Sequence, residues 1–271
     1  MRSGPREEAA HRRQVRLLHQ LRPLSTSAGD ARRAATTCGP AAGVTIGPNL
    51  FKAAIADRRK QIGMWSGLGS ALSADILADS GYDWVLLDTE HSPQGALEVY
   101  DQLLALDRSD ITTPVVRPSW NDPVQIKKLL DIGARTLLVP YVSTAEEARR
   151  AVASVRYPTA GMRGVAGTTR ATRYGRDKAY VTNASDEICL LVQIETKAGI
   201  ENIEAIAAVD GVDGVFIGPA DLSAALGFIE DRNHPTVIET IKAMGRRIAA
   251  AGKPAGILTV GNPEQVRVLS P

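Results

Sequence analysis

The stretch LLVQIETKAGIENIEAIAAVDGVDGVFIGPADLS, residues 190–223, decides the fold of this chain. It contains two short apolar runs, residues 190–194 and 214–217, separated by a segment with the apolar spacing of an amphipathic helix. This order predicts a strand, a helix and a second, parallel strand. Each apolar run is followed by a carboxylate, Glu195 or Asp221. Ligands of parallel α/β proteins bind at the carboxyl ends of strands, so we expect both acids to face one site.

The same alternation of apolar runs and helical segments continues on both sides of this stretch. Residues 121–123 read NDP before one helical segment and Gly133 follows it, which are typical helix start and stop signals. Seven strands alternating with helices predict an α/β fold, a TIM-type (β/α)8 barrel truncated before strand eight. The expected strands are residues 62–65, 84–87, 114–116, 136–139, 190–194, 214–217 and 255–260, and the main expected helices are 50–59, 70–78, 94–106, 123–132, 144–155 and 234–251.

The two ends of the chain differ from this regular pattern. Residues 1–46 carry eight Arg against three acidic residues and have no sustained periodicity. We expect a disordered or non-native extension there, with an organellar transit segment as the alternative, and a barrel domain over residues 47–271. No eighth strand precedes Pro271, and an open barrel leaves two unpaired strand edges. We therefore expect a fragment of a longer protein, or else closure by a partner chain.

Composition excludes several classes of function. The net charge is +2 for the whole chain and +5 for residues 1–46, which leaves −3 for the rest, so nucleic-acid binding is not indicated. No apolar run approaches the roughly 20 residues that span a bilayer, and no membrane association is expected. Cys38 and Cys189 do not form a disulfide framework. A reducing compartment fits this cysteine use, and we expect a cytoplasmic protein.

The two acids that follow strands five and six suggest a metal site. Side chains alternate along a strand, so Gln193 and Glu195 share one face, and the same alternation groups Asp221 with Val215 and Ile217. Two carboxylates with otherwise open positions suit Mg²⁺ or Mn²⁺, which retain water and accept substrate oxygens. The alternative is that each acid only caps the helix that follows it.

Other strand ends also carry polar side chains. Asp88, Glu90 and His91 follow the second strand, where a carboxylate beside an imidazole suits a general base. Arg117 ends the third strand and is suited to hold a carboxylate or enolate oxygen. The alternatives are a loop histidine bonded to backbone, and a barrel salt bridge from Arg117 to one of the acids. Lys197 is a candidate for forming a Schiff base with the substrate. The alternative is that Lys197 is a solvated loop lysine.

Several longer motifs of this chain resemble those of one known family, the HpcH/HpaI aldolases. The resemblance covers about residues 47–260, and the motifs occur in the family's order. They are GYDWVLLDTEHSP (81–93), VVRP (115–118), LDIGARTLLVP (130–140), RYP with GMRGV (156–165), LVQIETK (191–197) and GVFIGPADLS (214–223). The resemblance implies a class II pyruvate aldolase, which requires a divalent metal.

The family's catalytic residues carry over to matching positions of this sequence. The resemblance implies Glu195 and Asp221 as ligands of Mg²⁺ or Mn²⁺, with Co²⁺ as a further candidate. It implies His91 as the base, acting with a metal-bound water and polarised by Asp88, with Asp131 as a further support. Lys197 then has no Schiff-base role.

The resemblance also implies a substrate site. Arg117 would contact the pyruvate oxygens, and Gln193 would lie beside the bound substrate. The backbone N–H groups of Ala220 and Asp221 would receive the pyruvate carboxylate, and Leu258 would border the aldehyde. The implied reaction cleaves a 4-hydroxy-2-oxo acid, such as 4-hydroxy-2-oxoheptanedioate, to pyruvate and an aldehyde. The partners are thus a 2-oxo acid and an aldehyde.

Alternatives remain within and outside this activity. Related members act on the sugar acids 2-dehydro-3-deoxyglucarate or 2-keto-3-deoxyrhamnonate, and more distant ones resemble citrate lyase and use an acyl-CoA. A non-catalytic, truncated barrel is the alternative from another class. Family members also continue through an eighth strand and a terminal helix into a hexamer of dimers. A homo-oligomer is expected for a chain that is complete at its C-terminus.

Overall fold

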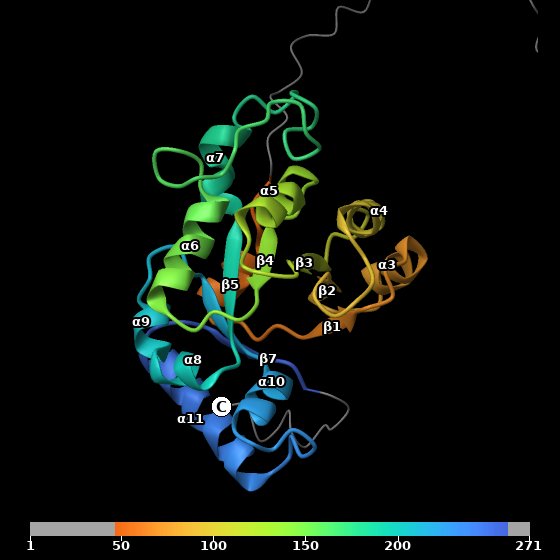
Figure 1. Cartoon of the computed structure of the whole chain (residues 1–271). Coiled ribbons are helices and arrows are strands. Elements are labelled where there is room, and N and C mark those ends of the chain that lie inside the picture. The colour runs from red at the N-terminus through yellow and green to blue at the C-terminus, as the bar shows by residue number, and fades with distance from the viewer. Residues whose placement is uncertain (1–46, 260–271) are drawn as a thin grey trace, which may run out of the picture. The chain divides into compact units, whose positions relative to one another are not determined.

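The structure, a computed structural model, describes residues 47–259, in which seven parallel strands form one curled sheet (Figure 1). The strands are β1 (Gly63–Ser66), β2 (Trp84–Asp88), β3 (Thr113–Arg117), β4 (Thr136–Val139), β5 (Cys189–Ile194), β6 (Gly214–Ile217) and β7 (Ala255–Ile257). They are hydrogen-bonded in sequence order, each parallel to the next. This arrangement confirms the predicted TIM-type barrel without an eighth strand within the described range. The predicted extension 1–46 and residues 260–271 lie outside that range.

Helices connect the strands, most of them at the positions that the sequence signals indicate. They are α2 (Leu50–Ala56), α3 (Ala71–Ala78), α4 (Ala96–Leu106), α5 (Pro123–Asp131), α6 (Ala145–Val155), α7 (Tyr180–Glu187), α8 (Lys197–Glu201), α9 (Ile203–Ala207), α10 (Pro219–Ala225) and α11 (Pro235–Ala250). Asp122 caps α5 by accepting from Val124 and Gln125 N–H, both at 2.9 Å. Helix α7 was not predicted, and the helix expected between β5 and β6 is divided at Asn202 into α8 and α9.

The two faces of the sheet pack against different partners. On β5, Leu190, Val192 and Ile194 face outward into the core shared with the surrounding helices, whereas Leu191 faces the barrel interior. This is the strand alternation expected from the sequence. Because both faces are buried, the strands are nearly continuous apolar runs.

Helix α2 packs against the interior from the amino ends of the strands. Phe51 and Ile55 of this helix belong to the interior cluster. Asn49, the N-cap of α2, donates from Nδ2 to Thr136 Oγ1 and to the Glu187 carbonyl, both at 3.0 Å. The carboxyl ends of the strands stay available for a site. No helix in residues 47–259 is long and apolar enough to cross a membrane.

Candidate active site

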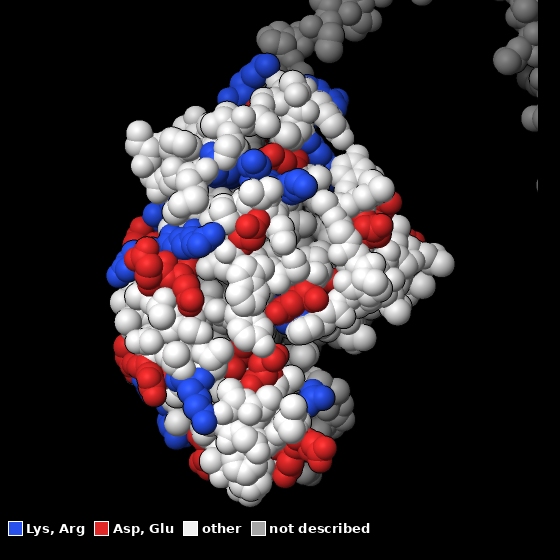
Figure 2. Space-filling model, in the orientation of Figure 1, with Lys and Arg blue, Asp and Glu red and all other residues white. Residues whose placement is uncertain are grey.

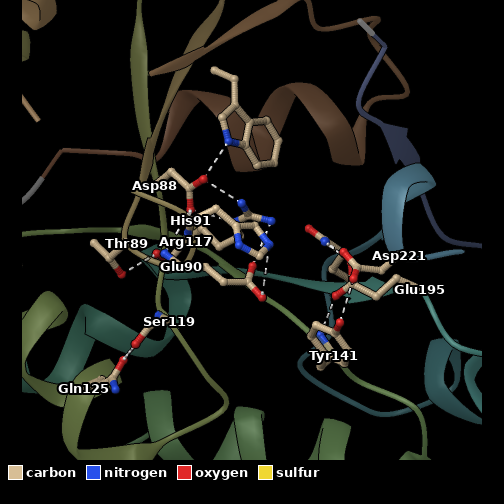
Figure 3. Close-up of polar contacts among 12 residues, drawn as sticks. Asp88, Thr89, Glu90, His91, Arg117, Ser119, Gln125, Tyr141, Glu195 and Asp221 are labelled. Carbon is tan, nitrogen blue, oxygen red and sulfur yellow. Dashed lines mark hydrogen bonds and ion pairs between the residues drawn. The ribbon is translucent and has the colours of Figure 1, made fainter. Parts of the chain in front are cut away.

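The predicted metal ligands lie close together at the carboxyl ends of β5 and β6. Glu195 directly follows β5 and is only 2% exposed, and Asp221 lies in the first turn of α10. Tyr141, which follows β4, contacts both: its backbone N–H donates to Glu195 Oε1 at 2.9 Å and its hydroxyl donates to Asp221 Oδ1 at 2.7 Å (Figure 3). Gln193 Nε2 donates to Glu195 Oε2. One tyrosine therefore joins two acids from neighbouring strands.

Neither acid is the N-cap of the helix that follows it. Helix α8, which follows Glu195, is capped by Thr196, whose hydroxyl accepts from Gly199 N–H at 3.0 Å. The N-cap of α10 is Gly218, and the carboxylate of Asp221 accepts from Tyr141 instead. The capping interpretation is thus wrong for both residues. Lys197, the first residue of α8, is exposed, as a solvated lysine would be.

The argument that placed Asp221 by strand alternation is wrong. Val215 and Ile217 belong to the outer core and Phe216 to the interior cluster, so continued alternation would point Asp221 toward the helices. The chain instead leaves β6 at Gly218 and enters α10. Strand parity ends there, and the first turn of the helix brings Asp221 to Tyr141 beside Glu195.

A second group is built around Arg117 at the end of β3. Its Nε and Nη2 donate to the two carboxylate oxygens of Asp88, at 2.8 and 2.6 Å. Its Nη1 lies 2.8 Å from Glu90 Oε2. The indole of Trp65 donates to Asp88 at 3.0 Å and lies under the guanidinium, 4.7 Å from ring centroid to Arg117 Cζ. The salt-bridge interpretation of Arg117 is thus correct, yet two hydrogen bonds to Asp88 use only part of its donor set.

The two groups face each other, with Glu90 between them (Figure 3). Burial raises the pKa of Glu195 to about 7, and the charges of Glu90 and Asp221 add to the shift against hydrogen bonds from Gln193 and Tyr141. Burial also raises the pKa of Glu90 to about 7, helped by Asp88 and Asp221 and opposed by Arg117.

The pKa of Asp88 shifts in the opposite direction, downward. Its burial favours a higher pKa, but hydrogen bonds from Arg117 and Trp65 outweigh it and hold the pKa below its usual range. On the face shown in Figure 2, acidic side chains lie over the central region beside α10, with basic and acidic side chains interspersed elsewhere. Several carboxylates thus face one guanidinium, an arrangement that favours a further cation.

The donor set fits a hard divalent cation with open coordination positions. Within residues 47–259, no group of three or more His, Cys, Asp or Glu side chains could hold a metal ion. The fit is therefore judged on the two carboxylates that Tyr141 joins, Glu195 and Asp221. Gln193 Oε1 is buried without a hydrogen-bond partner, which offers a third oxygen at the same place. Mg²⁺ is typically held by one or two carboxylates and keeps several waters for substrate oxygens.

Of the residues expected to support His91 as the base, Asp88 lies near it and Asp131 does not. His91 is exposed, with 61% of its side chain accessible, and its Nε2 lies 3.9 Å from Glu90 Oε1. Asp88 accepts from the backbone N–H of His91 at 3.4 Å. Asp131 is the last residue of α5, close before β4, where its carboxylate accepts from Arg163 at 3.1 Å. Within one chain the structure therefore brings His91 to Glu90 and does not bring Asp131 to His91.

The remaining predicted residues lie around the same strand ends. Ala220 is in the first turn of α10, where backbone N–H groups have no helical acceptor. Leu258 follows β7 and packs, partly buried, against the interior cluster. Sequence reasoning gave no role to Trp65 or Tyr141. Both stand at a strand end, Trp65 in β1 and Tyr141 after β4, so the rule that selected Arg117 would have found them.

Fold and site together define the class: a (β/α)-barrel enzyme with an acidic centre and a fixed arginine at the carboxyl ends of its strands. A family model described as HpcH/HpaI aldolase/citrate lyase matches residues 61–266. A hydroxypyruvate/pyruvate aldolase of Sagittula stellata is 54% identical, over 78% of this chain and 83% of its own length. A 4-hydroxy-2-oxo-heptane-1,7-dioate aldolase of Salmonella dublin is 53% identical, over 78% and 80%.

A solved structure agrees with these relatives. An HpcH/HpaI aldolase/citrate lyase family protein from Burkholderia cenocepacia superposes with a TM-score of 0.76 at 38% identity, over 81% of this chain and 87% of the other. The chain belongs to the HpcH/HpaI aldolase/citrate lyase family, and the relatives above place it with the aldolases of that family.

Proposed function

We propose that this chain is a divalent-metal-dependent aldolase that cleaves a 4-hydroxy-2-oxo acid to pyruvate and an aldehyde. The observation that carries this proposal is the pairing of two adjacent acids, the buried Glu195 and the partly buried Asp221, with one oriented arginine. Glu195 and Asp221 are joined by Tyr141, and Arg117 is held by Asp88 on the other side of Glu90. Such a site can bind a 2-oxo acid at its oxygens and stabilise negative charge on them.

Glu195 and Asp221 would hold the metal, with Gln193 beside them. When bound, Mg²⁺ or Mn²⁺ supplies a Lewis acid for the 2-keto oxygen. Two carboxylates and a neutral amide leave positions for substrate oxygens.

Arg117 supports the same charge from the opposite side. Arg117 is only 5% exposed, and its guanidinium is oriented by two hydrogen bonds to Asp88 and by the face of Trp65. Cleavage places negative charge on the 2-keto oxygen as pyruvate leaves as its enolate. A fixed guanidinium needs no reorganisation when that charge develops, which lowers the barrier. The N–H groups of Ala220 and Asp221 would receive the pyruvate carboxylate.

His91 would remove the proton that starts cleavage. Its imidazole takes the proton of the C4 hydroxyl, the C3–C4 bond breaks, and C4 leaves as the aldehyde carbonyl. The electron pair of the broken bond forms the enolate, which becomes pyruvate after protonation at C3. Glu90, at 3.9 Å from His91 Nε2, would stabilise the imidazolium formed.

The relatives' names supply the substrate class. One is named for 4-hydroxy-2-oxo-heptane-1,7-dioate and one for hydroxypyruvate or pyruvate. We therefore propose pyruvate as the keto-acid half and 4-hydroxy-2-oxoheptanedioate as a substrate, with hydroxypyruvate as an alternative donor. Leu258, beside the interior cluster, would border the aldehyde half.

The test is release of pyruvate from racemic 4-hydroxy-2-oxoheptanedioate by the purified 271-residue chain. Pyruvate that appears with Mn²⁺ or Mg²⁺, disappears with EDTA and returns when metal is restored supports the proposal. Glu195→Ala and Asp221→Ala are expected to abolish this turnover. Full activity in EDTA, or in either variant, would contradict the metal site. In the synthetic direction, a comparison of pyruvate with hydroxypyruvate assigns the donor.

A further inference from the structure

We propose that Tyr141 is a positioning residue that holds Glu195 and Asp221 in register and thereby sets the affinity of the site for a divalent cation. The inference rests on the proposed function, because it concerns the same two acids. Its geometric basis is that a single residue donates two hydrogen bonds, one to each acid. These acids belong to separate β-α segments, so nothing in the local sequence couples them.

The backbone of Tyr141, which donates to Glu195, is strained and is held in place by hydrogen bonds to the end of β5. Tyr141 has φ 55, a left-handed conformation that non-glycine residues rarely adopt. Such a backbone is strained, and it persists where surrounding contacts determine it. Here the N–H of Tyr141 donates to Glu195 Oε1 at 2.9 Å and the N–H of Val142 donates to the Gln193 carbonyl at 3.0 Å. Two consecutive N–H groups thus clamp this turn to the end of β5.

The side chain of Tyr141, which donates to Asp221, is held in place by an aromatic contact. The ring of Tyr141 packs on Trp120, with ring centroids 5.4 Å apart and planes inclined by 31°. The phenol can then reach Asp221 Oδ1 at 2.7 Å. The tyrosine hydroxyl is the donor in this bond, because a carboxylate oxygen such as Asp221 Oδ1 accepts.

A fixed carboxylate binds a cation more tightly than a free one. Hydrogen-bonded partners of metal ligands orient them, and loss of one typically lowers metal affinity about 10–100-fold. Tyr141→Phe removes only the hydroxyl and keeps both the ring on Trp120 and the backbone N–H to Glu195. We expect a Kd for Mn²⁺ about 10–100-fold higher than that of the wild type, with kcat recovered at saturating metal.

The matched control is Tyr174→Phe. Tyr174 is exposed, and its hydroxyl also makes one hydrogen bond, at 3.1 Å to the hydroxyl of Tyr100. The control thus loses the same group and one hydrogen bond, away from the acids. Its Kd for Mn²⁺ is expected to equal that of the wild type.

The experiment measures Mn²⁺ binding to the full chain by electron paramagnetic resonance, without substrate, beside a thermal melt with and without Mn²⁺. Weak binding and a small Mn²⁺-induced rise in Tm for Tyr141→Phe alone support the inference. Wild-type affinity in this variant overturns it, even if turnover has changed. No Mn²⁺ binding by the wild type overturns the proposed function itself. Tyr141→Leu, which also keeps the backbone N–H, gives a second reading and is expected to bind no better than Tyr141→Phe.

Discussion

Gly218→Ala tests whether the position of the Glu195 carboxylate matters. A Cβ at residue 218 would lie 2.1 Å from Glu195 Oε2 and 2.7 Å from Gln193 Nε2. Ordinary van der Waals contact begins at 3.4 Å, so the carboxylate oxygen must move by about 1.3 Å. Gly218 has φ −91, which alanine adopts without strain. The substitution therefore displaces the acid by steric contact alone.

The expected result is a folded protein with a damaged site. A misplacement of about 1 Å can lower a rate by roughly 10²-fold, so we expect kcat/KM for pyruvate release to fall by about that factor. Mn²⁺ affinity should fall as well, while the melting temperature changes little because a side chain can give way. The assay is the metal-dependent release of pyruvate, beside a Mn²⁺ titration and a thermal melt.

Gly245→Ala is the matched control. Residue 245 lies inside α11, and a Cβ there meets nothing within 4 Å. Alanine in place of glycine inside a helix is expected to stabilise the fold by about 0.5–1 kcal/mol and leave kcat/KM unchanged. Wild-type turnover and Mn²⁺ affinity in Gly218→Ala would refute the reasoning, because the acid could then move without consequence.

Further predictions concern three individual side chains. Asp131→Asn should lower the free energy of unfolding, measured by urea melts, by about 3–5 kcal/mol, because it leaves the fully buried Arg163 guanidinium without its counter-charge. Arg163→Met removes the buried charge itself and should cost less. Equal costs for the two variants would contradict this order. In a Cys38→Ser variant, iodoacetamide at pH 8 should label Cys189 only after the protein is unfolded. Burial raises the pKa of that thiol and so suppresses the reactive thiolate. Rapid labelling of Cys189 in the folded protein would disprove the burial. The thiol of Cys189 ionises more easily in the unfolded chain, where its pKa is about 8.5, than in the fold. The free energy of unfolding should therefore fall as the pH rises above about 8.5, which melts at a series of pH values can measure. His91→Ala should lower kcat by about 10²–10⁴-fold, and an unchanged kcat would assign the base elsewhere.

Local patterns were sufficient to predict most of the fold. Apolar runs of strand length, Asp122 before Pro123 and glycine stops such as Gly133 act over a few residues, so their meaning does not depend on the rest of the chain. Helix α7 was missed because it lies between a Gly- and Arg-rich loop and β5 with a weak apolar pattern.

The site shows where such reasoning ends. Sequence alone determined that acids stand at the ends of strands five and six and that Arg117 ends strand three. Only the tertiary structure decided that Gly218 turns Asp221 inward, that Tyr141 joins it to Glu195, and that Asp131 stays with Arg163. The physical reason is distance along the chain: a strand's alternation is set by neighbouring residues, whereas a bond between residues 141 and 221 depends on how separate segments pack.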